Sequence, residues 1–481
     1  MRKNITDLSN HYVVFGTGPS AIATIHGIID TCNNDNKKIF VIDAGMTNNM
    51  DLSFEKSKKK YTMPSPKFKI VKNRYVYDSF KSLINLTEDG FEAVGSLAKG
   101  GLSNIWGACI QPYSAKELSQ FPYSYSEIKN IYSKIYKILT NTDTDWDKKG
   151  EIINKSNCFF MDTPLLAINL KNGSNESCHL KCCNDGCVNC NRNVFNSGNE
   201  FDILNKSDKV IYMNNLFISS VDYKEEHYLI NCIEISSSKD KIIKANKIYS
   251  CLGAISTTKI ILQMSKKTSS VPLLTTPGGA FFIYSFKEFH NLNHQILSSR
   301  SFRGDLNNNL FEGNIFPFSE NLIKTYFGQK LGKLLLILFG KLIFSRVFIA
   351  NIYFSSDLSA STLININDEV KISAKTSSKL KFIFKKVMKN IYKELFKRGL
   401  YIMPIGKKIL RPGQDIHYGG SIPMKLYPKE NQCDFKGELY GYKNFYVTDS
   451  TSMPFLASKG HSFNSMVNAY YISSKSTHNQ S

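Results

Sequence analysis

The chain has 481 residues, of which 42% are hydrophobic, so it can bury a large core and is too long for one compact domain. Its 61 Lys and Arg outnumber its 40 Asp and Glu, giving a net charge of +21, but they are spread along the chain without a basic arm, zinc-finger spacing or an RNA-binding aromatic signature. This pattern excludes nucleic acid as the expected partner, whereas a basic surface suits an anionic membrane face or an acidic substrate.

The cysteines and the N-terminal segment indicate the compartment. Eleven cysteines, an odd number, favour free thiols or metal ligands in a reducing environment over disulfides. Residues 1–11 are polar, so no secretory signal peptide is expected, and no uncharged apolar run is long enough for a spanning helix. We therefore expect a cytoplasmic protein, and peripheral association with the inner membrane stays open.

Residues 13–45 have the order strand, glycine turn, helix, strand, acid. The turn GTGPSA follows one apolar run, and a second apolar run, IFVI, ends in Asp43. Gly16 permits the turn, Gly18 lets the backbone approach a pyrophosphate, and Ala21 keeps helix and strand close. Asp43 can accept both hydroxyls of an adenosine ribose. The stretch predicts a dinucleotide site, although the motif alone does not separate FAD from NAD.

A second glycine-rich segment, GSLAKGGLSNIWGACI, occupies residues 95–110. Its four glycines, together with Ser103, Asn104 and Trp106, can lie against a flat ligand because backbone N–H groups near Gly101 are not obstructed by side chains. The alternative is a glycine-rich loop with a packed tryptophan.

Five cysteines fall within one short segment: Cys178, Cys182, Cys183, Cys187 and Cys190. Four thiolates at such spacing can hold zinc or an iron–sulfur cluster. Neither common signature fits, because a zinc ribbon needs two separated pairs and a ferredoxin needs regular gaps. The alternative is a cysteine-rich loop whose thiols bind no metal.

Residues 209–250 alternate short β-branched and aromatic runs, which predicts an antiparallel meander followed by a return to the parallel sheet. The chain then reads SCLGAISTTKIIL, a second strand, glycine and helix junction. Gly253 in this junction is expected to bring another helix N-terminus toward the nucleotide.

Two later stretches have helical periodicity. Residues 331–349 are apolar but carry Lys333, Lys341 and Arg346, which argues against a membrane span. The stretch is expected either to pack inside the second domain, which we favour, or to lie in a membrane interface. Residues 379–398 predict a clear amphipathic helix with a lysine-rich solvated face.

The C-terminal part carries two histidines on glycine-bearing segments and one acid. His417 precedes two glycines in IHYGGSIPM, Asp449 ends the strand-like run NFYVTD, and His461 lies in the loop before a final helix. Imidazoles often serve only as hydrogen-bonding groups in a core. Two of them in a chain that begins with a dinucleotide motif make a catalytic pair a reasonable hypothesis.

These motifs together resemble the glucose-methanol-choline (GMC) oxidoreductases, FAD-dependent enzymes that oxidise alcohols. The resemblance rests on GTGPSA with VIDAG, GGLSNIWGA, SCLGAISTTKIIL, HYGGSIPM, and NFYVTDSTSMP followed by SFNSMVNA, in the family's order. Residues 120–200 and 275–410 show no matching motif. The versions HYGGSIPM and GGLSNIWG are most similar to a bacterial branch associated with polysaccharide biosynthesis, which implies a sugar or glycan substrate.

The resemblance implies a role for each matched residue. Gly16, Gly18 and Asp43 would hold the ADP half of FAD, and Asp449 would lie by the pyrophosphate and ribityl. Gly101, Ser103 and Asn104 would approach the isoalloxazine ring.

His417 matches the histidine beside the reactive nitrogen of the flavin. The family has a second His or Asn at the start of the last helix, where the ungapped register puts Gly460, with His461 one residue later.

The resemblance implies an α/β fold, in which a Rossmann-like FAD-binding domain (parallel sheet plus β-meander) accompanies a discontinuous α+β substrate domain. The FAD-binding domain is expected at 1–118, 200–272 and 411–481, and the substrate domain at 119–199 and 273–410. The expected activity is hydride transfer from an alcohol CH–OH group to flavin with a histidine base. The electron acceptor stays open, and the alternatives are an NAD(P)-dependent reductase and a non-catalytic flavoprotein scaffold.

Overall fold

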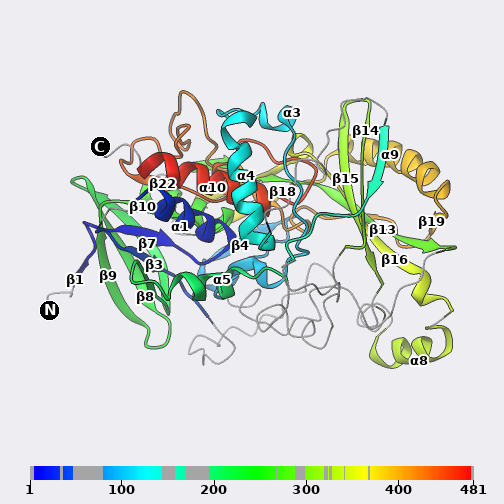
Figure 1. Cartoon of the computed structure of the whole chain (residues 1–481), viewed down its shortest axis with the longest axis horizontal. Helices are drawn as coiled ribbons and strands as arrows, with labels where there is room; N and C mark the ends of the chain where they lie inside the picture. The colour runs from blue at the N-terminus through cyan, green and yellow to red at the C-terminus, as the bar shows by residue number, and fades with distance from the viewer. Residues whose placement is uncertain are drawn as a thin grey trace.

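The computed structural model describes residues 5–32, 36–46, 80–142, 158–168, 194–266, 269–287, 298–318, 323, 328–340, 342–366 and 369–477. In Figure 1 the chain forms two bodies side by side, with a parallel sheet and both termini on the left and a large antiparallel sheet on the right.

The first body is built on a five-stranded parallel sheet. Its strands, in spatial order, are β22 (Phe445–Val447), β10 (Ile248–Ser250), β2 (Tyr12–Phe15), β3 (Ile39–Ile42) and β6 (Val210–Met213). All neighbouring pairs are parallel. The three central strands are apolar and almost wholly buried, as expected for a parallel sheet covered on both faces.

Helices cover this sheet. Helix α1 (Pro19–Thr31) follows β2 and packs along the last helix, α10 (Ser462–Thr477), and α6 (Ala254–Met264) follows β10. A Cβ at Gly27 would lie 2.1 Å from Ser473 Oγ, so this glycine allows the close approach of α1 and α10. The shorter helices are α3 (Ala115–Leu118) and α5 (Ser197–Leu204).

Helix α4 (Tyr125–Thr140) also packs on α10 (Figure 1), and its apolar face belongs to the first core. The sequence assigns this part of the chain, 119–199, to the substrate domain. The packing therefore joins α4 to the first body.

The predicted meander forms a separate four-stranded sheet. Its order is β1 (Ile5–Asp7), β9 (Lys239–Ala245), β8 (His227–Glu234) and β7 (Leu216–Lys224). β7, β8 and β9 are antiparallel, and the chain then returns to the parallel sheet at β10, as the sequence predicts.

The second body is a seven-stranded antiparallel sheet. It runs β19 (Leu400–Ile402), β13 (Gly278–Ser285), β16 (Val347–Phe354), β15 (Asn309–Pro317), β14 (Arg300–Leu306) and β5 (Cys158–Asp162), and β20 (Lys408–Ile409) also pairs with β13. Helix α9 (Ser378–Phe396) buries the apolar face predicted for 379–398 against this sheet and forms a second core with it. The α/β fold class with an added α+β body is confirmed.

Two smaller sheets connect the bodies. One has the order β11 (Ser269–Pro272), β17 (Ser361–Ile366), β18 (Glu369–Ala374) and β4 (Leu86–Asp89). The other pairs β12 (Leu274–Thr275) with β21 (Tyr418–Gly419). Leu363, Val370 and Ile372 join the first core, so part of the segment 273–410 packs with the first body.

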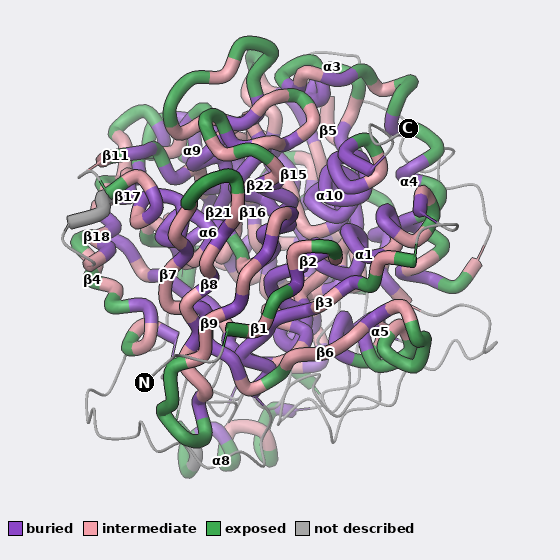
Figure 2. Tube along the Cα trace, turned by 90° about the vertical axis from the view of Figure 1, so that its left-hand side faces the viewer, coloured by how far each residue is buried: buried purple, intermediate pink, exposed green. Residues whose placement is uncertain are grey.

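Helix α8 (Gln329–Phe339) is not buried in the core, which is the placement that the sequence analysis favours for residues 331–349. It ends at Phe339 and lies at the margin of the molecule in Figures 1 and 2. Leu336 packs inward, whereas Ile337 and Leu338 are exposed, so most of the apolar surface of α8 faces outward. Within the described residues, no helix combines the length and the apolar character that crossing a bilayer requires.

Candidate active site

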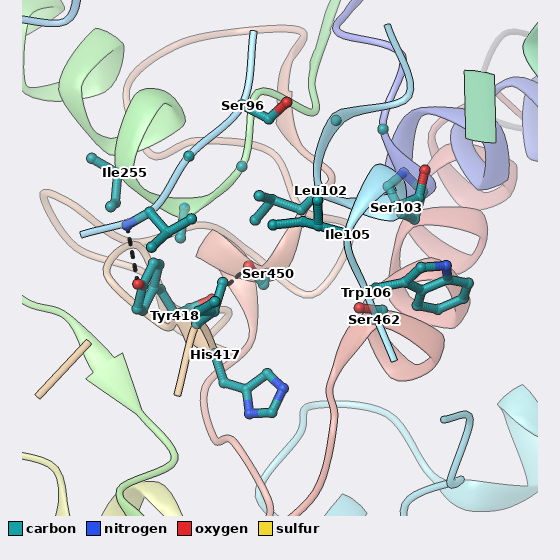
Figure 3. A pocket seen from close by; sticks show the side chains of 18 of the residues that line it. Ser96, Leu102, Ser103, Ile105, Trp106, Ile255, His417, Tyr418, Ser450 and Ser462 are labelled. Carbon is teal, nitrogen blue, oxygen red and sulfur yellow. Dashed lines mark hydrogen bonds between the residues drawn. The ribbon is translucent and has the colours of Figure 1, made fainter. Parts of the chain in front are cut away.

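A cavity of about 370 Å³ lies between the parallel sheet and the antiparallel sheet. Its lining extends from Gly16 and Gly18 at one end to His417 and His461 at the other. Figure 3 shows Leu102 and Ile105 facing this space opposite Tyr418, with the ring of His417 below. The volume is within the range of small-molecule and cofactor sites.

The first glycine turn has the geometry that a phosphate cradle needs. Gly16 has φ +89, and a Cβ there would lie 2.9 Å from the carbonyl oxygen of Cys251, so only glycine fits. Gly18 lines the cavity at the N-cap of α1, and a Cβ there would meet nothing within 4 Å. Pro19 and Ser20 also line the cavity, so the positive end of the α1 dipole lies at its wall. Ala21 is fully buried in α1.

Asp43 follows β3 and lines the same end of the cavity. The hydroxyl of Thr17 donates a hydrogen bond to its Oδ2, and Thr17 Oγ1 accepts one from the backbone N–H of Gly100 at 2.9 Å. Burial raises the pKa of Asp43 to about 6 despite the hydrogen bond from Thr17. A ligand that donates hydroxyl protons to this carboxylate would favour its ionised form.

The second glycine segment forms the short 3₁₀ turn η2 (Gly101–Asn104). Ser103 Oγ donates to the Gly100 carbonyl at 2.6 Å and accepts from Ser197 N–H at 3.0 Å. Asn104 Nδ2 donates to the Lys99 and Gly101 carbonyls, so its amide holds the loop together. Gly101 and Ser103 line the cavity, whereas the amide of Asn104 is used inside the loop.

Asp449 and Gly253 lie together, although they come from distant parts of the chain. Gly253 has φ +83 and forms the N-cap of α6. Asp449 Oδ2 accepts hydrogen bonds from Gly253 N–H at 2.8 Å and Thr257 Oγ1 at 2.6 Å, and Oδ1 accepts from Thr451 N–H at 2.9 Å. Both Asp449 and Gly253 line the cavity, so Asp449 fixes the junction that faces it.

The two histidines meet at the other end of the cavity. The ring centroids of His417 and His461 are 5.2 Å apart, with planes at 80°. Burial, followed by the neighbouring His461, holds the pKa of His417 well below its usual value, and burial lowers the pKa of His461 to about 4. Both rings are therefore neutral at pH 7. A Cβ at Gly460 would lie 3.9 Å from His417 Nε2, so Gly460 faces that nitrogen.

The backbone before His417 is strained. Ile416 has φ 58, in the left-handed region that a β-branched residue rarely adopts. The conformation turns the chain so that His417 faces the cavity, where its ring packs edge-on against Tyr353 at 4.9 Å. Strain of this kind persists where the surroundings enforce it, often at a functional site.

Thr276 contacts Nδ1 of His417, and Asp415 in turn contacts Thr276. Thr276 Oγ1 lies 2.8 Å from Nδ1, and Asp415 Oδ2 accepts a hydrogen bond from the Thr276 N–H at 2.9 Å and lies 3.4 Å from its hydroxyl. Burial raises the pKa of Asp415 to about 7. The three residues thus form a chain from the ring to a buried carboxyl group.

The antiparallel sheet contributes polar groups that the sequence does not single out. Asn314 on β15 and Asn351 on β16 are directly paired, and both line the cavity with Tyr353. Cys109 Sγ donates to Asn314 Oδ1 at 3.6 Å. Asn351 is the only amide in the largely apolar β16, whereas β15 also carries Asn309 and Glu312, so the local signal at these positions is weak.

The predicted metal ligands lie elsewhere. Cys178, Cys182, Cys183, Cys187 and Cys190 fall within 169–193, outside the described residues. Among the residues that are described, no group of three or more His, Cys, Asp or Glu side chains is arranged to hold a metal ion. The zinc or iron–sulfur hypothesis stays a prediction.

Comparisons with known proteins identify the fold. No protein-family model matches the sequence. No curated protein sequence matches it either. Among solved structures, that of pyridoxine 4-oxidase from Mesorbium loti matches with a TM-score of 0.64 and 9% sequence identity, covering 98% of this chain and 100% of that chain. The chain is therefore similar in fold to pyridoxine 4-oxidase over nearly its full length.

Proposed function

We propose that this protein binds FAD in the cavity and oxidises the CH–OH group of an alcohol. The observation that carries the proposal is the pair of neutral imidazoles, His417 and His461, at one end of a cavity whose other end is a glycine turn and a helix N-terminus. The fold, shared with a protein named as an oxidase of pyridoxine, supports the same conclusion.

The residues present fit an extended dinucleotide. The open space at Gly18 and the free N-terminus of α1 suit the pyrophosphate, and Asp43 suits the ribose hydroxyls. The backbone of Gly101 and Ser103 suits a flat ring, because their side-chain atoms do not fill the cavity. Bound FAD would supply a hydride acceptor for the alcohol carbon.

His417 is the proposed general base. Removal of the hydroxyl proton needs an unprotonated Nε2, which requires the ring proton on Nδ1. Nδ1–H can donate a hydrogen bond to Thr276 Oγ1, and the Thr276 hydroxyl can donate one to Asp415. This pair of hydrogen bonds favours the required tautomer. The C–H bond breaks as hydride departs, the O–H proton moves to Nε2, and a carbonyl remains.

The remaining groups are proposed to hold the alcohol. Nδ1 of His461 is buried and has no hydrogen-bond partner among the described residues, so it is free to engage the substrate oxygen. Asn314 and Asn351 offer amide groups from the antiparallel sheet. With the motif resemblance, these amides support a sugar or glycan as the substrate class.

The alternatives fit the geometry less well. An NAD(P)-dependent reductase would leave unexplained why Gly101, Gly253 and Asp449 line one long cavity with the first glycine turn. A non-catalytic scaffold would not need two neutral imidazoles facing each other behind a strained Ile416.

The visible spectrum of the purified protein, followed by anaerobic addition of candidate alcohols, tests the proposal. We expect a yellow protein whose flavin absorbance bleaches with one member of a panel of sugars, glycans and pyridoxine. Folded protein that takes up no added FAD would overturn the cofactor assignment. Flavin that binds and is not reduced by any class of alcohol would favour the scaffold.

A further inference from the structure

Helix α8 and the residues after it carry an exposed apolar surface, which we call the α8 patch. Its members are large apolar side chains with exposed fractions from 42% at Phe339 to 75% at Leu342: Leu331, Leu334, Ile337, Leu338, Phe339 and Leu342. Isolated exposed apolar residues are common on soluble proteins, but a contiguous group on one projecting element marks an interaction surface. In Figures 1 and 2 the helix stands at the edge of the molecule.

The patch is amphipathic in the sense that suits a water–lipid boundary. At about 100° per residue, Leu336 and Gly332 face the molecule, where Leu336 packs on a small core, and both are less exposed than the outer face. Both Lys330 and Lys333 are exposed: Lys333 lies at one edge of that outer face, and Lys330 lies within it between Ile337 and Leu334. Lysines in this position can keep their charge in water while their stems cover apolar surface.

The local charge has one sign. The sequence from 321 to 356 contains five basic residues, Lys324, Lys330, Lys333, Lys341 and Arg346, and no Asp or Glu. This basic segment belongs to a chain whose net charge is already +21. Of these residues, Lys330 and Lys333 are exposed on α8, whereas Lys324 and Lys341 lie outside the described residues. The positive charge of Lys330 and Lys333 complements the negative potential of anionic lipid headgroups, which falls off within a Debye length.

The base of the patch is well anchored. Leu336 and Phe344 pack around the buried core residues Phe318 and Val347. Arg346 Nη1 donates to the carbonyl oxygen of Phe286 at 2.6 Å, which ties the turn after α8 to the end of β13. The patch is thus preformed on a sheet, and binding need not first order it.

We propose that the α8 patch docks this protein peripherally on an anionic lipid bilayer, with α8 lying in the plane of the interface. The apolar side chains enter the boundary of the acyl chains, and Lys330 and Lys333 contact the phosphate groups. Docking would place the antiparallel sheet, which contributes Phe316 and Ile349 to the cavity wall, next to the bilayer. The proposal does not depend on the activity proposed above.

Co-sedimentation of the full-length purified protein with vesicles tests the docking. Vesicles of phosphatidylcholine with phosphatidylserine should bind the protein at low salt, and vesicles of phosphatidylcholine alone should bind it much less. Ile337→Glu and Leu342→Glu should each lower binding roughly tenfold or more through the loss of buried apolar area. Lys330→Gln with Lys333→Gln should lower binding to the anionic vesicles by roughly tenfold or more.

A matched control separates docking by the α8 patch from nonspecific adsorption to the vesicles. Ile203 on α5 is 61% exposed, so Ile203→Glu makes the same chemical change on another helix and should leave vesicle binding unchanged. A tryptophan at Ile337 should shift its emission to the blue on vesicle addition and be quenched by brominated lipid. Wild-type protein that stays in the supernatant at low salt would overturn the proposal. A second result would also overturn it. If the wild type binds no vesicles and self-associates in sedimentation velocity, and Ile337→Glu abolishes this self-association, the patch is a contact between copies of the chain.

Discussion

The rings of His417 and His461 meet at a centroid distance of 5.2 Å, and each is held in its neutral form by burial. They differ in how their Nδ1 atoms are held. Nδ1 of His417 is engaged by Thr276, whereas Nδ1 of His461 has no partner among the described side chains and backbone. This difference is the basis of the proposed roles, in which His417, whose Nδ1 is held, acts as the base, and His461 binds the substrate oxygen.

Replacement of either histidine tests this assignment. His417→Ala should retain flavin and slow its reduction by substrate roughly a hundredfold or more, because the general base is lost. His461→Ala should reduce the rate less and raise KM, because it removes a contact to the substrate. Rapid-mixing absorbance of the flavin measures both variants. The opposite ranking would exchange the two roles.

Thr276 is expected to act as a positioning residue through His417. Thr276→Val keeps the shape and removes the hydroxyl that holds Nδ1, so flavin reduction should slow about tenfold while flavin content stays constant. Thr276→Ser restores the hydroxyl and should recover most of the rate. A rate that falls equally in Val and Ser variants would indicate packing and not hydrogen bonding.

The pH dependence should report Asp415. An ionised Asp415 accepts the hydrogen bond from the Thr276 hydroxyl more strongly than a protonated one, and burial raises the pKa of Asp415 to about 7. The rate of flavin reduction should therefore fall as pH drops through about 7. His417 adds a second loss only below its usual pKa range, because its pKa is lowered. In Asp415→Asn flavin reduction should be slower, and its rate should no longer fall as pH drops through about 7. A fall that persists in this variant would come from the titration of another group.

Ionised Asp415 should also lower the free energy of unfolding of the protein. Its folded-state pKa of about 7 exceeds its ordinary value of 3.8, so folding loses free energy as pH rises between these values, on the order of 4 kcal/mol in full. Asp415→Asn should raise the thermal midpoint of flavin-free protein at pH 8 and leave it nearly unchanged at pH 4. An equal shift at both pH values would show that the gain has no electrostatic origin.

The sequence predicts the local parts of this site and misses the parts that depend on strand register. Gly16, Gly253 and His417 stand in contiguous motifs, so their turns could be predicted from a few neighbours. Asn314 and Asn351 lie in two strands far apart in the sequence, and the pairing of β15 with β16 brings them to one cavity.

The sequence also does not predict which apolar side chains are buried. Periodicity identifies α8 as apolar but says nothing about which neighbours remain to cover it, so the favoured core interpretation is wrong for its outer face. The side chain of Asn104 likewise has a polar partner within its own loop, a detail that spacing alone does not reveal.

Gly18 offers a test of the cofactor end that disturbs folding only slightly. A Cβ there meets no protein atom within 4 Å, so Gly18→Val should destabilise flavin-free protein only through the poorer N-cap, on the order of 1 kcal/mol. The added side chain would occupy the space required by a pyrophosphate, so flavin uptake should be abolished. Equilibrium titration with FAD measures this, and unchanged affinity would move the pyrophosphate away from the first turn.

A buried ion cluster next to the histidines gives the last prediction. Lys459 Nζ lies 3.0 Å from Glu117 Oε2 and 3.7 Å from Glu312 Oε2, and both carboxyl groups are buried. Burial lowers the pKa of Lys459, but Glu117 and Glu312 outweigh this effect and raise it overall, so Lys459 is charged at pH 7. Lys459 stands two positions before His461, so the cluster fixes the loop that carries this ring.

Lys459→Met should therefore destabilise the fold by about 3 to 5 kcal/mol at pH 7, because it removes the cation that contacts two buried carboxyl groups. The loss should shrink as pH falls, since burial already raises the pKa of Glu312 and removal of Lys459 raises it further. Lys459→Met combined with Glu117→Gln and Glu312→Gln should recover most of the stability at pH 7. Thermal unfolding of the three forms at pH 7 and pH 5 measures this, and a single variant as stable as the wild type at pH 7 would show that the cluster contributes no net stability.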